Sequence, residues 1–173
     1  MQATVPAIAH VAKILSGLLL VFAAPDASCG QHMPGTILYI QSDKAAPAQG
    51  GYAQAVRLDG AHRLLFVSGQ IPVDAHGKVP TTFAGQCRQV WANIVHQLEA
   101  AGMGPEHIVK VNTYLADRAH AAENSQMRRE VLGDLKPALT IVIAGIYDPA
   151  WLLEIEVVAA MPMGVDPQTG AGR

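Results

Sequence analysis

An apolar stripe with a helical period constrains the fold of this chain more than any other feature of its sequence. Apolar side chains recur every three or four residues between positions 83 and 101, Thr81 or Thr82 can cap the first turn, and Gly102 ends the pattern. The stripe consists of Phe83, Cys87, Val90, Trp91, Ile94, Val95, Leu98 and Ala101. A helix with one apolar face must cover a second layer of secondary structure.

Stretches with strand composition flank this helix on both sides. Val, Ile, Thr and Tyr are frequent in them, and Asp59-Gly60 and Tyr147-Asp148-Pro149 provide turns. The expected strands are residues 36–40, 52–58, 63–68, 108–115, 139–144 and 151–160, with the second and third forming a hairpin and a less regular helix over 118–132. This order predicts an α+β domain in which two helices cover one face of a mixed sheet.

The composition indicates self-association. Half of the 173 residues are apolar and only 15% are charged, which leaves few charges to cover the surface of a monomer. The last strands are apolar on both sides, so we expect the sheet face opposite the helices to meet another subunit. The formal charge of −2, from 14 acidic and 12 basic residues without long runs, lacks the basic footprint of a nucleic-acid-binding protein.

The two ends of the chain are expected to lie outside the folded domain. The expected division is an N-terminal extension over residues 1–35, a domain over 36–162 and a C-terminal tail over 163–173. The apolar run at 14–24 is too short to cross a bilayer but has the length of a signal-peptide core. We expect a cytoplasmic protein with no membrane partner, whose extension is a leader before a start at Met33. The alternative is a periplasmic protein, if residues 1–28 act as a signal peptide.

The sequence carries no recognisable metal or disulfide pattern. Cys29 and Cys87 lie far apart and fit neither a disulfide framework nor a zinc spacing. The seven histidines show no pairing at the i, i+4 spacing of helical metal ligands. We therefore expect no metal, and we interpret Cys87 as a small apolar residue of the core.

Four blocks of residues between Ser42 and Ala160 stand in a specific order. They read DKAAP followed by GYAQAV at 43–56, LFVSGQIP at 65–72, VKVNTYL at 109–115 and LEIEVVA at 153–159. In this order and with these spacings they resemble the RidA (YjgF) family. The resemblance implies a chorismate-mutase-like subunit with a mixed six-stranded sheet and two helices on one face. It also implies a homotrimer whose sheets form a central barrel, with ligand clefts between neighbouring subunits.

The resemblance also implies a reaction and its residues. Family deaminases hydrolyse 2-imino or 2-enamino acids to the 2-oxo acid and ammonia without a metal or organic cofactor. Glu154 matches the family carboxylate that handles the attacking water, and Tyr52 and Asn124 match residues that line the cleft. The family arginine that holds the substrate carboxylate in the cleft follows a Pro-Ala pair. In this chain the residue after Pro137-Ala138, and so at the position of that arginine, is Leu139. The chain therefore resembles an arginine-less subgroup.

The residues themselves leave alternatives open. Glu154 and Glu156 lie two apart on an expected strand and so share a face, which could be a catalytic face or a solvated polar one. The resemblance favours a catalytic role for Glu154 and leaves Glu156 structural. Tyr52 could equally be a strand aromatic packed on the core.

Leucine at position 139 supplies neither charge nor donor, so a carboxylate substrate loses an orienting group. In principle Arg118, Arg128 or Arg129 could replace the missing guanidinium, but arginines on a helix surface are usually solvated.

The residues and the family resemblance favour two functions. The first is a deaminase that binds a small enamine- or imine-type metabolite between subunits and has weak or altered activity because of Leu139. The alternative is a non-catalytic protein of the same fold that binds a small metabolite. A ribonuclease ranks last, because the acidic chain offers neither a basic groove nor a plausible histidine pair.

We predict a trimer in solution, because the low charge fraction and the two-sided apolar strands call for partners and the resemblance implies three subunits. Light scattering at micromolar concentration is expected to give three times the mass of the 18.3 kDa chain. The mass of a monomer would contradict this prediction.

Overall fold

The computed structural model describes residues 34–48, 50–60 and 62–164. The apolar run at 14–24, the proposed signal peptide and most of the C-terminal tail lie outside the described residues. Among the described residues, no helix has both the length and the apolar character needed to cross a membrane.

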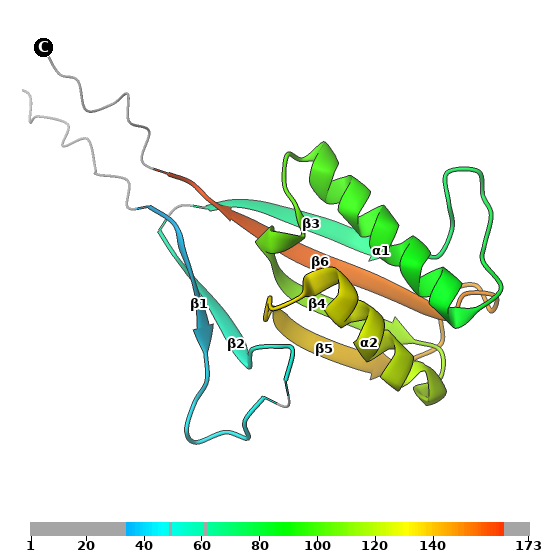
Figure 1. The fold of residues 1–173 in the computed structure, drawn as a ribbon, viewed down its shortest axis with the longest axis horizontal. Coiled ribbons are helices and arrows are strands. Elements are labelled where there is room, and N and C mark those ends of the chain that lie inside the picture. Colours follow the sequence, from blue (N-terminus) through cyan, green and yellow to red (C-terminus); the bar gives the residue numbers. More distant parts are fainter. Residues whose placement is uncertain (1–33, 49, 61, 165–173) are drawn as a thin grey trace, which may run out of the picture. The chain divides into compact units, whose positions relative to one another are not determined.

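Six strands and two α-helices follow one another in the predicted order (Figure 1). They are β1 (Thr36–Ile40), β2 (Ala55–Asp59), β3 (His62–Gln70), α1 (Phe83–Ala100), β4 (Ile108–Leu115), α2 (Ala121–Leu132), β5 (Ala138–Ile143) and β6 (Leu153–Pro162). Short 3₁₀ turns at Pro105–His107 and Arg118–His120 precede β4 and α2. The predicted spans of β1 and β4 are confirmed, and α1 begins after Thr82, whose hydroxyl accepts a hydrogen bond from the Gly85 amide at 3.1 Å.

The strands form two sheets rather than one, so the predicted six-stranded sheet is wrong for the described residues. Strands β3, β6, β4 and β5 form a mixed four-stranded sheet in that order, in which β4 and β5 are parallel and the other pairs antiparallel. The predicted hairpin of β2 and β3 is also wrong, because β2 pairs with β1, from Thr36 opposite Asp59 to Ile40 opposite Ala55. Gly60, in the connection between β2 and β3, adopts a left-handed φ of +74°. Closeness along the chain did not determine which edge each strand pairs with.

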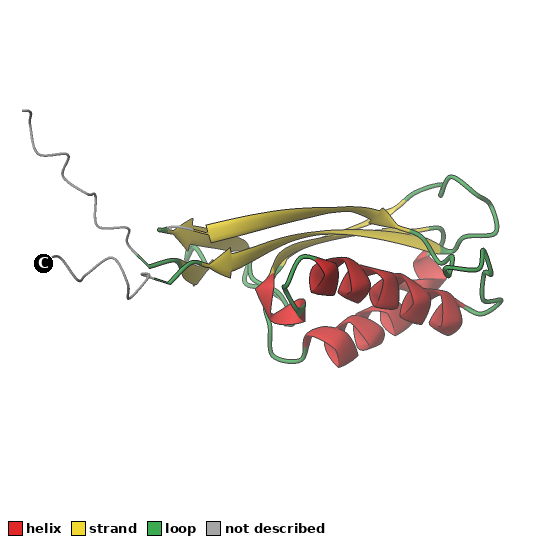
Figure 2. Cartoon of the chain, turned by 90° about the horizontal axis from the view of Figure 1, so that it is seen from above, coloured by secondary structure: helices red, strands yellow, loops and turns green. Residues whose placement is uncertain are grey.

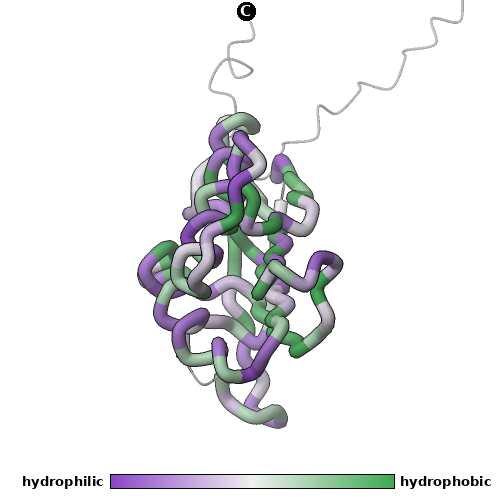
Figure 3. The backbone as a smooth tube through the Cα atoms, turned by 90° about the vertical axis from the view of Figure 1, so that its right-hand side faces the viewer, coloured by the Kyte–Doolittle hydropathy of each residue, from purple (hydrophilic) through white to green (hydrophobic). Residues whose placement is uncertain are grey.

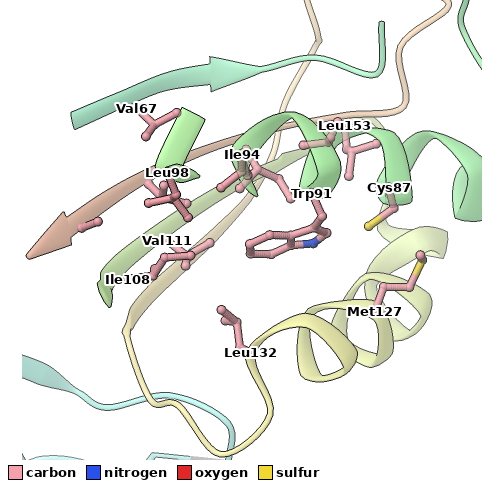
Figure 4. Packing of buried hydrophobic residues seen from close by; sticks show 14 of the residues in the cluster. Val67, Cys87, Trp91, Ile94, Leu98, Ile108, Val111, Met127, Leu132 and Leu153 are labelled. Carbon is pink, nitrogen blue, oxygen red and sulfur yellow. The ribbon is translucent and has the colours of Figure 1, made fainter. Parts of the chain in front are cut away.

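Both helices cover one face of the four-stranded sheet (Figure 2). Most of the predicted stripe of α1 is buried there, with Val90, Ile94 and Leu98 fully enclosed. Val95 and Ala101 of the stripe are only half-buried and lie outside the core cluster. Met127 and Leu132 of α2 complete the same cluster (Figure 4). Burying side chains of this size contributes about 1.5–3 kcal/mol each, so this layer contact is the main source of stability.

The face opposite the helices keeps apolar side chains in contact with solvent. Phe66 of β3 is 73% exposed and Leu64 is 48% exposed. Both alternate with Val67 and Leu65, which point to the core. Hydrophobic and hydrophilic residues alternate over short stretches of the backbone (Figure 3), as expected where each element has one buried and one open side.

A buried glutamine connects α1 to the segment that leads into β6. Gln86 is 2% exposed and donates from Nε2 to the carbonyls of Pro80 and Ala150 at 3.0 and 2.9 Å. Its Oε1 accepts from the Leu152 amide at 2.7 Å. Three backbone groups of two loops are thus satisfied by one side chain, which places the start of β6 against the helix layer.

Gln86→Leu is expected to destabilise the domain by on the order of 2 kcal/mol, because it retains the volume but leaves these backbone groups without partners. The melting temperature measured by circular dichroism should fall by several degrees. Gln89→Leu is the matched control, since Gln89 is half-buried on the same helix and, among the described residues, its side chain donates only to Asn93, at 2.8 Å. An equal loss in both variants would contradict the special role of Gln86.

Candidate functional site

The two glutamates of β6 lie on the sheet face that the helices leave open. Leu153, Ile155 and Val157 point into the core and are buried, while Glu154 and Glu156 between them are half-buried on the other side. The predicted shared face of the two carboxylates is therefore confirmed. Strand β6 lies between β3 and β4, so side chains from both neighbours flank the pair.

Gly69 of β3 provides the space that the Glu154 side chain occupies. The register of β3 against β6 shifts between Val67 and Gln70, which is the signature of a bulge. A Cβ atom at Gly69 would overlap Oε1 of Glu154 and lie 2.7 Å from its Cδ. The sequence showed this glycine within a family block, but its relation to Glu154 depends on the pairing of two strands far apart in the chain.

The two carboxylates differ in their hydrogen bonding. Asn112 donates from Nδ2 to Oε1 of Glu156 at 2.5 Å, and the Tyr114 hydroxyl donates to the same oxygen at 3.4 Å. The charge of Glu156, and to a smaller extent burial, raises the pKa of Tyr114. In the part of the chain that the structure describes, no hydrogen bond or ion pair engages the Glu154 carboxyl. Glu156 is therefore held by two neighbouring side chains, while no group of the described chain holds the Glu154 carboxylate.

Tyr52 and Leu139 lie on neighbouring segments. Tyr52 precedes β2 in a loop, where it is half-buried, instead of starting the strand as predicted. The next residue, Ala53, donates its amide to the Pro137 carbonyl at 3.2 Å and bridges to Ala138. Leu139 follows directly, is half-buried, and packs against the core. The loop before β2 thus runs beside the start of β5.

Asn124 is buried in α2 rather than exposed. It is 1% exposed, and neither its Oδ1 nor its Nδ2 has a hydrogen-bond partner in the described chain. Arg128, one turn further along, is also buried, although helix-surface arginines are usually solvated. The i, i+4 spacing of these two residues was visible in the sequence, but their burial was not.

Two hollows open on the surface of the single chain. One, of about 260 Å³, lies on the open sheet face and is lined by Phe66, Lys110, Asn112 and Glu156 among others. The larger, of about 350 Å³, lies between α1 and α2 and is lined by residues that include Trp91, His96 and Met127. Neither is lined by Tyr52, Asn124, Leu139 or Glu154. Neither of these two hollows therefore includes the predicted site residues.

Cys87 shows no sign of reactivity. It is fully buried in the core, and burial raises the pKa of its thiol to about 12, so the thiolate is not populated near neutral pH. Among the described residues, His, Cys, Asp and Glu side chains form no group of three or more that could hold a metal ion.

Comparison with known proteins identifies the fold and the family. Residues 43–161 match the family model described as Endoribonuclease L-PSP. Protein HMF1 of Saccharomyces cerevisiae is 33% identical over 140 residues, which cover 80% of this chain and 95% of that protein.

Two solved structures share this fold. YyfB of Yersinia pestis, a Rid-family protein, superposes with a TM-score of 0.63 at 26% identity over 72% of this chain and 98% of its own. RidA of an Antarctic Psychrobacter superposes with a TM-score of 0.55 at 30% identity, over 72% of this chain and 99% of its own. An identity above 30% along nearly the whole of one relative, together with the shared fold of two solved structures, shows that the chain belongs to the RidA/YjgF/L-PSP family.

Proposed function

We propose that this protein is a cofactor-independent hydrolytic deaminase that acts on a small imine or enamine. The observation that carries the proposal is the Glu154 carboxylate, which lies beside Gly69 on the open face of β6 without a described partner. An unpaired, half-buried carboxylate can orient a water molecule and accept its proton. Its neighbour Glu156 already accepts hydrogen bonds from Asn112 and Tyr114 on one carboxylate oxygen, which makes it the less suitable base.

The proposed reaction uses water as its only co-reactant. The oxygen of a water molecule bonds to the carbon of the C=N group while Glu154 takes a proton, and the electron pair of the double bond moves to nitrogen. Glu154 then returns this proton to nitrogen, which gives a carbinolamine. The hydroxyl proton of the carbinolamine passes by way of Glu154 to the nitrogen as the C–N bond breaks, so the carbonyl forms and ammonia leaves. An enamine first becomes the imine by taking a proton on carbon and losing one from nitrogen.

We further propose that the reaction takes place in clefts between the subunits of a homotrimer, with Tyr52 and Asn124 lining the cleft. The exposed Phe66 and Leu64 support burial of the open sheet face by neighbouring subunits. A site completed by a second subunit also fits the finding that Glu154 lines neither of the two hollows described above.

Leu139 supports weak or altered activity on substrates that carry a carboxylate. Its apolar side chain packs against the core, so it offers no donor at the position of the family arginine. The acid group of the substrate would then be absent or held by another residue, and the chain would belong to an arginine-less subgroup. The same feature favours the second candidate, a metabolite-binding protein without turnover. A cytoplasmic location and the lack of nucleic-acid and membrane partners remain predictions.

Glu154→Gln is expected to lower the rate of 2-iminobutanoate hydrolysis by at least about 100-fold, because the amide cannot accept the proton of water. The imine would be generated in the assay by a threonine dehydratase, and its loss compared with the uncatalysed rate. Glu156→Gln is the matched control and should retain most of the activity. Full activity in Glu154→Gln would contradict the mechanism, and the absence of any acceleration by the native protein would favour the binding protein.

Gly69→Ala is expected to keep the fold and displace the Glu154 carboxyl, because the new Cβ overlaps the far end of a flexible side chain. The deamination rate should fall as in Glu154→Gln, while the melting temperature changes by only a few degrees. Gly145→Ala is the matched control, because a Cβ there meets nothing within 4 Å. A fully active Gly69→Ala variant would show that the position of the carboxyl is not critical.

A further inference from the structure

Arg128 is a buried charge without a partner in the described chain. It is 5% exposed, and its Nε and Nη1 atoms are buried without a hydrogen-bond acceptor. The ion pairs among the described residues join Arg57 with Asp59 and Glu106 with His107, so neither includes Arg128. Burial, and then the charge of Arg129, lowers the pKa of Arg128, and no carboxylate opposes this shift.

A guanidinium stays charged in proteins, and burying one unpaired is strongly destabilising. A fold retains such a group only where a partner from outside it completes the interaction, or where the charge serves a purpose. Arg128 therefore points to an anion that the single chain does not supply.

The amide of Asn124, beside Arg128, is also buried without hydrogen-bond partners in the described chain. Asn124 precedes Arg128 by one helical turn, so both side chains lie on the same face of α2. Neither polar atom of the Asn124 amide has a described partner, although the residue is 1% exposed. Two adjacent buried groups together offer guanidinium and amide N–H donors, which match the two oxygens of a carboxylate.

The guanidinium of Arg128 lies against the loop before β2. A Cβ atom at Gly51 would lie 3.7 Å from Nη2 of Arg128, so the end of the arginine side chain lies against this glycine. Gly51 has a φ of +68°, a conformation that residues with a side chain rarely adopt. The loop continues through Tyr52 to Ala53, which bridges to Ala138 beside Leu139. Arg128 therefore lies against the loop that runs beside Leu139. Leu139 is the uncharged residue at the position of the family arginine.

We propose that Arg128, assisted by Asn124, binds the carboxylate of a small organic acid. Arg128 in α2 would thus take the role of the family arginine, whose position in β5 is Leu139. The identity of the acid as an imino acid or its 2-oxo product rests on the proposed function, whereas the anion site itself does not. The substrate therefore keeps its acid group, and the substitution at Leu139 changes the direction from which this group is held.

The test compares binding of 2-oxobutanoate to the full-length native protein, to Arg128→Met and to Arg129→Met by calorimetry. Met has a similar length to Arg and no charge, and Arg129 is the exposed neighbour on the same helix, so the two variants lose the same charge. We expect the dissociation constant to rise at least tenfold in Arg128→Met and to stay within twofold in Arg129→Met. The neutral analogue 2-oxobutanamide should bind the native protein and Arg128→Met equally weakly.

The melting temperature without ligand separates a binding role from a structural one. If Arg128 serves an external anion, removing the unpaired charge should leave the melting temperature of Arg128→Met at or above that of the native protein. A lower melting temperature or a smaller mass in light scattering, with 2-oxobutanoate affinity unchanged, would overturn the proposal and indicate an acidic group of a second copy as the partner. Absence of 2-oxobutanoate binding to the native protein would also overturn it.

Two further variants keep the test decisive. If Arg128→Met does not fold, Arg128→Lys retains the charge but loses the planar fork of donors, and the dissociation constant should still rise several-fold. Glu154→Gln separates the anion site from the proposed mechanism. If Glu154→Gln keeps full deaminase activity, the proposed mechanism fails, while loss of 2-oxobutanoate binding in Arg128→Met would still establish the anion site.

Discussion

The position of β6 within the four-stranded sheet is the constraint on which the rest of the structure depends. It pairs with β3 on one side and β4 on the other, so its backbone hydrogen bonds are satisfied along both edges. One face contributes Leu153, Ile155 and Val157 to the core under the helices, and the other presents Glu154 and Glu156. A slip by one residue would bury both carboxylates and expose the core side chains, so core packing also determines where the acid groups lie.

Some buried polar side chains of this domain are hydrogen-bonded within it, and others are not. Gln86 satisfies three backbone groups and so joins the helix layer to the loop before β6. Asn124 and Arg128 are equally buried, but the described chain leaves most of their polar atoms without partners. A satisfied network stabilises a fold, whereas an unsatisfied one costs stability and is retained where a ligand or a subunit meets it. The second pair therefore marks a place where the molecule is completed from outside.

Much of the fold could be predicted because its elements have strong local signals. The helical stripe and a cap at Thr81 or Thr82 located α1, and the Val- and Thr-rich run located β4. The pairing of the strands could not be predicted, because any strand with a free edge can pair with several others. A single six-stranded sheet was expected, whereas the structure has two sheets and β2 pairs with β1. For the candidate site, the resemblance indicated Glu154, Tyr52, Asn124 and Leu139, but not the close approach of Gly69 or the burial of Arg128.

The sequence by itself determined which residues alternate or repeat along each element, and therefore that Glu154 and Glu156 share the face opposite the core. This follows from the period of two in a strand, which needs no knowledge of neighbours. Only the tertiary structure decided that Glu154 lies in the space left by Gly69 and Glu156 against Asn112, and that Arg128 meets Gly51. These contacts join residues far apart in the chain. They depend on strand register and helix packing, which arise when the whole domain excludes water, and no local pattern encodes them.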